Sequence, residues 1–148
     1  MLAAMENRSV PVDLVLPHVF YDDVAAAIGW LGRVFGLEEH YRYGEPAAGA
    51  QLRLGKAVVM LSEAQRPGRS TPARSGLQTQ MLTIFVDDVD AHFAKAKAGG
   101  AEIVEELNEP IYGERQYVAR DPEGHSWLFS QHVRDVDPRE WGAQVAKE

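Results

Sequence analysis

The chain has 148 residues, of which 45% are hydrophobic and 25% charged, and its formal net charge is −7. This is an ordinary globular composition, and so acidic a chain does not favour the phosphate backbone of nucleic acids. Cysteine is absent, which excludes disulfides, thiolate catalysis and cysteine metal ligands. No apolar run is long enough to span a membrane and the start lacks a signal-peptide pattern. We therefore expect a cytoplasmic protein without nucleic-acid or membrane partners.

The first half of the chain predicts one strand, one helix and three further strands. Residues 12–21 are apolar and β-rich, and they end at Asp22 and Asp23, either of which can cap a helix. One helical face then carries Val24, Ile28, Leu31 and Phe35. Gly36 ends this helix. Strands are expected over residues 37–43, 50–54 and 57–62.

The second half repeats this plan after a loop rich in proline, glycine and arginine at residues 65–76. Phe85-Val86-Asp87-Asp88-Val89 matches Phe20-Tyr21-Asp22-Asp23-Val24 of the first half. A strand at 78–86, a helix at 89–98 and strands at 101–107, 115–120 and 126–131 are expected. The sequence thus predicts an α+β fold of two paired βαβββ modules forming a curved mixed-sheet cup. The predicted parts are modules 12–64 and 78–132, a linker 65–77 and a C-terminal helical extension 133–148.

Several short motifs, in this order and spacing, resemble the vicinal oxygen chelate superfamily. They are an Asp-Asp-Val turn into each helix, Phe35-Gly36-Leu37 after the first helix, and Asp121-Pro122-Glu123-Gly124 before the last strand. That family includes glyoxalase I, extradiol dioxygenases, fosfomycin-resistance enzymes and bleomycin-resistance proteins, and the resemblance covers residues 12–131. It implies a cup around a small molecule. It also implies a homodimer, in which the segment around Trp141 is expected to join the interface.

The resemblance also indicates where a metal would be bound. The family's metal enzymes take one ligand from the first and one from the last strand of each module, and counting carries these positions onto Leu16, Met60, Met81 and Leu128. None of these side chains is an oxygen or imidazole donor, so we expect no metal and no cofactor. His18 lies on the same strand face as Leu16. It could contact a ligand, act as an acid or base, or serve a structural role, and the sequence leaves these alternatives open.

Strand alternation predicts a mostly apolar cup lining with a few hydroxyls and one imidazole. The predicted ligand-binding residues are Leu16, His18, Phe20, Met60, Ser62, Met81, Thr83, Phe85, Leu128 and Ser130. The expected function is metal-independent binding of a small, mostly apolar or aromatic molecule. One alternative is a lyase- or dioxygenase-type enzyme of the same superfamily, with a shifted metal site or with His18 as acid or base. Another is a structural or regulatory dimer with a vestigial pocket.

The remaining histidines are expected to have no part in the cup. His125 follows the turn at residues 121–124 and is expected to hold that turn by a hydrogen bond. His40, His92 and His132 lie in polar or edge segments and are expected at the surface.

Overall fold

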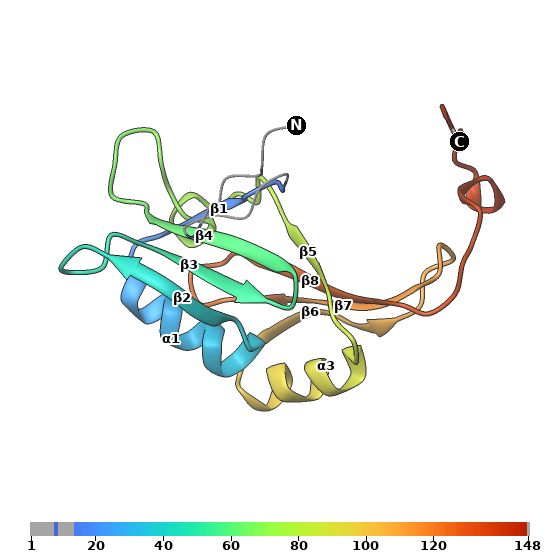
Figure 1. The fold of residues 1–148 in the computed structure, drawn as a ribbon, viewed down its shortest axis with the longest axis horizontal. Helices are drawn as coiled ribbons and strands as arrows, with labels where there is room; N and C mark the ends of the chain where they lie inside the picture. The colour runs from blue at the N-terminus through green and yellow to red at the C-terminus, as the bar shows by residue number, and fades with distance from the viewer. Residues whose placement is uncertain (1–7, 9–13, 148) are drawn as a thin grey trace, which may run out of the picture.

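A computed structural model of the chain describes residue 8 and residues 14–147, and it confirms the predicted α+β fold of two βαβββ modules (Figure 1). The first module contains β1 (His18–Tyr21), α1 (Val24–Phe35), β2 (Glu38–Tyr43), β3 (Gly49–Leu54) and β4 (Ala57–Glu63). The second contains β5 (Leu82–Phe85), α3 (Val89–Ala98), β6 (Glu102–Asn108), β7 (Glu114–Arg120) and β8 (Ser126–His132). A one-turn helix, α2 (Pro72–Ser75), lies between them, and a 3₁₀ helix, η1 (Pro138–Trp141), follows the second module.

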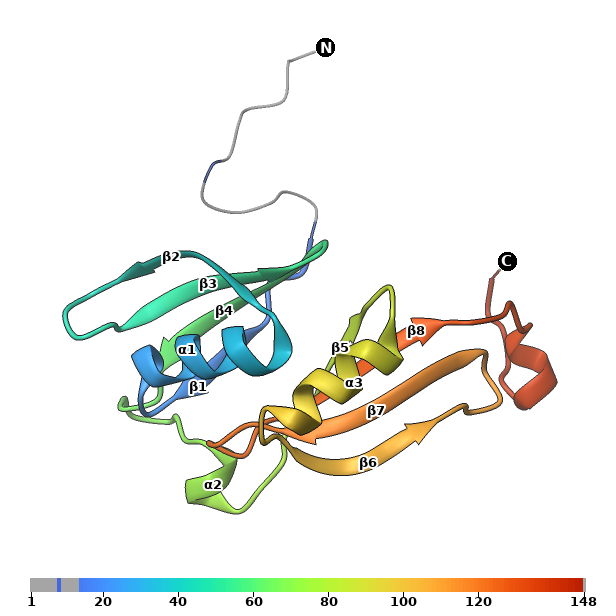
Figure 2. The same ribbon diagram turned by 90° about the horizontal axis from the view of Figure 1, so that it is seen from below.

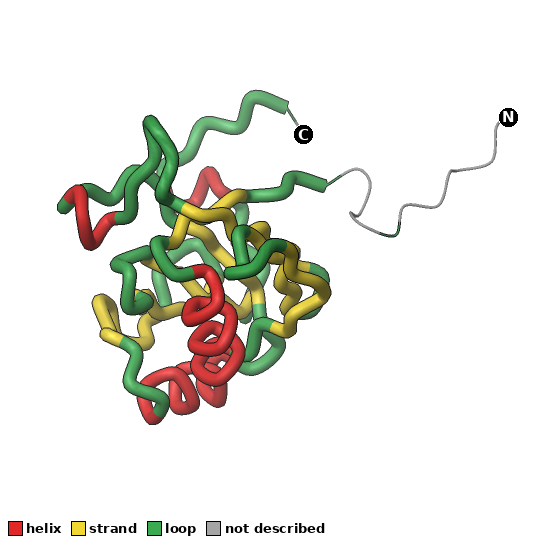
Figure 3. Tube along the Cα trace, turned by 90° about the vertical axis from the view of Figure 1, so that its left-hand side faces the viewer, coloured by secondary structure: helices red, strands yellow, loops and turns green. Residues whose placement is uncertain are grey.

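Each module forms its own four-stranded mixed sheet. The strand orders are β1-β4-β3-β2 and β5-β8-β7-β6, and in both sheets the first strand pairs parallel with the last while the other pairs are antiparallel. Helices α1 and α3 lie on the same side of the molecule, each against its own sheet (Figures 1 and 3). Neither of these two helices covers the opposite face of its sheet.

The two long helices begin and end where the sequence predicts. The Asp23 side chain accepts a hydrogen bond from the backbone N–H of Ala26, and Asp88 does the same for Ala91, so each aspartate caps its helix. Gly36 ends α1 in the left-handed conformation at φ 78°, which a residue without Cβ adopts at little cost.

Three segments differ from their predicted structure. β5 begins at Leu82 rather than at residue 78, because its parallel partner β8 begins only at Ser126 and offers no ladder to the earlier residues. The predicted loop contains α2, in which Pro72 is the first helical residue after the Thr71 cap. The C-terminal extension forms only the single turn of η1. Part of the first predicted strand, residues 12 and 13, falls outside the described residues.

One hydrophobic core joins the two modules. It contains α1, α3 and the helix-facing side chains of both sheets, and the ring of Phe35 at the end of α1 lies 4.8 Å from that of Phe129 in β8. Because the modules share this core, they are held together by burial of apolar surface. Among the helices described here, none combines the length and apolar character that crossing a membrane requires.

The turn between β7 and β8 fastens the second module to the first. The carboxylate of Asp121 is buried, and it accepts hydrogen bonds from the hydroxyl of Tyr21 at 2.7 Å and from the indole N–H of Trp127 at 3.0 Å. It also accepts from the backbone N–H groups of Glu123 and His125. One carboxylate therefore organises the turn and binds it to β1.

The C-terminal segment after β8 leaves the body of the molecule. Figures 1 and 2 both show it running away from the two sheets to η1. Its Trp141 contacts Tyr112 of the β6–β7 connection, with ring centroids 6.1 Å apart, and remains 39% exposed. This segment thus presents apolar side chains beyond the core of its own chain.

Candidate functional site

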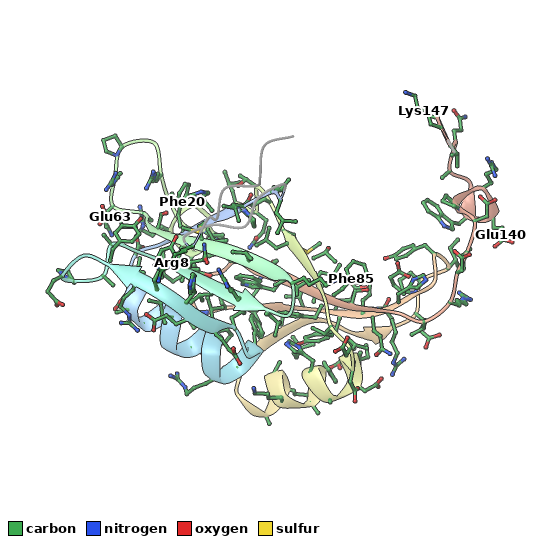
Figure 4. The ribbon with its side chains drawn as sticks, in the orientation of Figure 1. Arg8, Phe20, Glu63, Phe85, Glu140 and Lys147 are labelled. Atoms are coloured by element: carbon green, nitrogen blue, oxygen red, sulfur yellow. The ribbon has the colours of Figure 1, made fainter. Side chains whose placement is uncertain are left out.

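The sheet faces that point away from α1 and α3 carry the side chains predicted to line the cup. Val19 and Tyr21 are buried in the core, so strand alternation leaves His18 and Phe20 on the opposite face of β1. Figure 4 shows Phe20 and Phe85 on the side of the ribbon away from the two helices. We call these two surfaces the open faces. Their other predicted members are Met60 and Ser62 of β4, Thr83 of β5, and Leu128 and Ser130 of β8.

On the open face of the first sheet, one row of side chains is covered by the chain itself. Backbone pairing sets Phe20 beside Ser62 and Ser62 beside Gly49. The guanidinium of Arg69 from the linker lies 4.5 Å from the centre of the Phe20 ring. The side chain of Tyr43 lies so close over Gly49 that a Cβ there would collide with it. Arg69 and Tyr43 therefore cover part of this row, and Phe20 lines a cavity of about 270 Å³ together with residues of the linker.

The corresponding row of the second sheet is left uncovered at its outer end. Phe85 lies beside Ser130, and Ser130 lies beside Gln116. Phe85 is 58% exposed, and it lines a cavity of about 450 Å³ together with Leu54 and Lys56 of the first module. The internal repeat places the two rows at equivalent positions in their sheets. Phe85 is therefore more exposed than Phe20 because different side chains lie over the two rows.

Two polar side chains in this second row lack hydrogen-bond partners. Ser130 is 1% exposed, and its Oγ has no partner among the described residues. Gln116 is 6% exposed, and within residues 14–147 its carboxamide makes no hydrogen bond, whereas its backbone carbonyl accepts one from Asn108. Its amide atoms are not among the buried atoms without partners, so the carboxamide reaches solvent. The buried Ser130 hydroxyl does lack a partner, which costs free energy and is rare in folded proteins.

A second row in the first sheet contains the only predicted imidazole of the lining. The parallel register of β1 and β4 sets His18, not Leu16, directly opposite Met60. Leu16 precedes β1, and His18 is exposed. In the second sheet the equivalent pair is Thr83 and Leu128. The residues that the repeat brings to matching positions are therefore one imidazole, one thioether, one hydroxyl and one isobutyl group.

These residues do not fit a divalent metal ion. A structural or catalytic site needs at least three oxygen, imidazole or thiolate donors in one place, whereas these positions supply one imidazole and one neutral hydroxyl. In the described ranges, no group of three or more His, Asp or Glu side chains lies close enough together to hold an ion.

Gln51 is a residue of the open face that the sequence reading missed. It is fully buried in β3, and its Oε1 accepts hydrogen bonds from Nδ1–H of His40 at 2.7 Å and from Arg53 at 3.2 Å. A β-bulge at His40 brings two consecutive residues, His40 and Tyr41, onto the same face. Polar residues at alternate positions of β3, Gln51 and Arg53 among Ala50, Leu52 and Leu54, were the available signal.

His125 and His92 both lie at the junction of the modules. Nε2–H of His125 donates to the backbone carbonyl of Phe20 at 2.6 Å, so it ties the second module to β1 as well as flanking its own turn. His92 is half-buried rather than at the surface, because Nε2–H donates to the Phe35 carbonyl at 2.8 Å and Nδ1 accepts from the hydroxyl of Tyr117 at 2.6 Å. Burial lowers the pKa of His92, which favours the neutral ring.

The buried hydroxyl of Tyr21 is held in its neutral form. Burial, then the charge of Asp121 and their hydrogen bond, raise the pKa of Tyr21 well above its ordinary value. Tyr21 is therefore a permanent hydrogen-bond donor to Asp121. Its side chain belongs to the core and not to an open face.

Comparisons with known proteins agree on one family. The model of the Glyoxalase/Bleomycin resistance protein/Dioxygenase superfamily matches residues 12–129. An uncharacterized protein of Mycobacterium tuberculosis is 34% identical over 139 residues, which are 89% of this chain and 82% of that protein. TioX from Micromonospora sp. ML1 is 34% identical, with a TM-score of 0.68 over 80% of this chain and 97% of its own. Lactoylglutathione lyase from Agrobacterium tumefaciens, at 20% identity and a TM-score of 0.63, covers 90% of this chain and 98% of its own, and shares the fold.

Proposed function

This chain belongs to the Glyoxalase/Bleomycin resistance protein/Dioxygenase superfamily, and from the side chains of its open faces we propose that it is a metal-independent binding protein. It holds a small, mostly apolar or aromatic molecule against the open faces of its sheets. The site residues of this proposal are those predicted from the sequence, with Phe85 and its row at the centre.

The exposure of Phe85 is the observation that carries the proposal. A ring that is 58% exposed on a sheet face, beside a cavity of about 450 Å³, offers apolar surface of the size that ligand pockets use. Met81, just before β5, is 48% exposed and adds an adaptable side chain. Large apolar side chains exposed on one sheet face are a feature of binding sites.

The donor chemistry of the open faces supports binding without a metal. His18 is opposite the thioether of Met60, and Thr83 is opposite Leu128. Of these four side chains only the His18 imidazole is a good metal ligand, whereas a metal site needs several. The proposed interaction is therefore apolar contact together with hydrogen bonds to neutral groups.

A second copy of this chain is the proposed partner that completes the site. Ile111 is 64% exposed and Val133 41% exposed at the root of the C-terminal segment, and Trp141 lies farther along it. Val133 and Trp141 belong to the C-terminal segment, which extends from the body (Figure 1), and Ile111 belongs to the β6–β7 connection. Another molecule can bury side chains exposed in this way. We propose a homodimer in which this segment packs on the partner.

A thermal-shift screen with small aromatic compounds tests the proposed function. Phe85→Ala is the test variant, and Phe93→Ala is the matched control because Phe93 is also a phenylalanine of the second module but lies in α3, on the helix side of the sheet. Compounds that stabilise the wild type should lose about 2 kcal/mol of binding free energy in Phe85→Ala, the value of burying most of one ring. They should bind Phe93→Ala normally. A screen in which no compound stabilises the wild type would refute the proposal.

An acid–base enzyme is the second candidate function, because His18 is exposed on an open face and bears the imidazole of its row. If the protein is such an enzyme, His18→Ala should still bind the compound but should no longer convert it to product. Product analysis by mass spectrometry after incubation with each compound found in the screen separates this candidate from simple binding.

A further inference from the structure

We infer that Gln116 and Ser130 form a recognition pair for a carboxamide or lactam group, borne on a flat ring that packs against Phe85. This inference rests on the proposed binding function and specifies the chemistry of its ligand. It follows from three observations: the unpaired hydroxyl, the unpaired carboxamide and the exposed ring, all in one row of β5, β8 and β7.

The unpaired groups define what the ligand must offer. A glutamine carboxamide has both an N–H donor and a C=O acceptor, and a serine hydroxyl both donates and accepts. A ligand carboxamide or lactam matches the Gln116 carboxamide through two antiparallel hydrogen bonds, N–H to oxygen in each direction. The same ligand group can also bond with Ser130 Oγ, since neighbouring residues on a sheet face lie about 5 Å apart. Neither Gln116 nor Ser130 supplies a counter-charge for a charged group, and the charged side chains near Phe85 are Lys56 and Asp87, which line the cavity beside it.

The first module serves as an internal comparison. There the equivalent of Phe85 is Phe20, and its ring is covered by the planar guanidinium of Arg69. The equivalent of Gln116 is Gly49, which has no polar side chain and lies under Tyr43. The chain thus covers one row with its own flat groups and leaves the other with polar groups unpaired. A flat molecule over Phe85 would stand where Arg69 stands over Phe20.

Binding at Ser130 requires that neighbouring side chains move. Ser130 is 1% exposed and Gln116 is 6% exposed, whereas the neighbouring Phe85 is 58% exposed. Exposed side chains exchange rotamers within nanoseconds, so Phe85 can move aside and close over the bound group without a change in the backbone. The hydroxyl that is unpaired in the free protein would then gain its partner from the ligand.

The test compares three naphthalene probes on the full-length protein by calorimetry or fluorescence. The probes are 2-naphthamide, 2-acetonaphthone, which keeps the carbonyl but lacks the amide N–H, and 2-naphthoate, which is charged. The wild type should bind the amide about tenfold more tightly than the ketone, the value of one good hydrogen bond. Binding of 2-naphthoate should be weaker than that of the amide.

The variants are Gln116→Leu, Ser130→Ala and, as matched control, Ser62→Ala, because Ser62 is the equivalent serine of the first module. Gln116→Leu should bind the amide and the ketone equally. Ser130→Ala should bind the amide several-fold more weakly and yet melt at the same or a higher temperature than the wild type, since it removes a buried hydroxyl without a partner. Ser62→Ala should preserve the preference for the amide.

The results that would contradict the recognition pair differ from those that would contradict the proposed function. Equal binding of amide and ketone by the wild type, or a marked loss of melting temperature in Ser130→Ala, overturns the recognition pair and leaves the binding function standing. If other aromatic compounds bind and the naphthamide does not, the inferred ligand class is wrong. If no aromatic compound binds at all, the proposed function itself fails.

Discussion

Replacing Asp121 by alanine tests how the two modules are held together. The change removes the acceptor of two buried donors, the Tyr21 hydroxyl and the Trp127 indole N–H, and of two backbone N–H groups in its own turn. Each buried donor left without an acceptor costs about 1–3 kcal/mol, so Asp121→Ala should lower the free energy of unfolding by about 4 kcal/mol. Tyr21→Phe removes one donor to a charged acceptor and should cost about 2 kcal/mol.

Urea unfolding at one fixed protein concentration, followed by circular dichroism and tryptophan fluorescence, measures both changes. Asp90→Ala is the matched control, because Asp90 forms a solvent-exposed ion pair with Arg115, and the change should cost far less stability than Asp121→Ala. In the Asp121→Ala background, Tyr21→Phe should be neutral or stabilising, since the hydroxyl that it removes is then unpaired. Equal costs for Asp121→Ala and Asp90→Ala would refute this account of the junction.

Four further predictions concern the remaining groups. Burial lowers the pKa of His92, so the stability that its neutral ring provides is complete above about pH 6.5 and should fall as the pH drops below that value; denaturation at several pH values should show a flatter profile in His92→Gln. His18→Ala should cost less than about 1 kcal/mol of stability, measured by thermal unfolding, because the side chain is exposed. Light scattering should give twice the mass of 16.4 kDa, and deletion of residues 133–148 should shift it toward the monomer. Elemental analysis after dialysis against Zn²⁺, Ni²⁺, Mn²⁺ or Fe²⁺ should find far less than one ion per chain, and one tight ion near His18 would contradict that expectation.

The local structure of the chain could be predicted from its sequence. The apolar stripe from Val24 to Phe35, the cap at Asp23 and the glycine at position 36 are contiguous signals, and they gave both ends of α1. The turn at residues 121–124 was predicted in the same way. Strand alternation also identified which side chains of β1, β4, β5 and β8 point away from the core.

What the sequence could not give depends on contacts between distant residues. Asp121 and Tyr21 are 100 positions apart, so no local pattern reports their hydrogen bond. His92 was predicted at the surface because its helix is polar. It lies at the junction of the modules because its imidazole donates a hydrogen bond to the Phe35 carbonyl at the end of α1. The unpaired state of Ser130 likewise depends on the side chains that fail to reach it.

The location of a bound ligand is the most direct test of the open-face proposal. Methionine-methyl and indole NMR signals can be followed while the tightest compound from the screen is added. The proposal predicts that the methyl signal of Met81 shifts and that this shift is lost in Phe85→Ala, whereas the indole signal of Trp30 stays unchanged. Trp30 lines a separate groove on α1 of about 190 Å³, with Arg33 and Pro122. A ligand that moves the Trp30 signal and leaves Met81 unchanged would contradict the proposal.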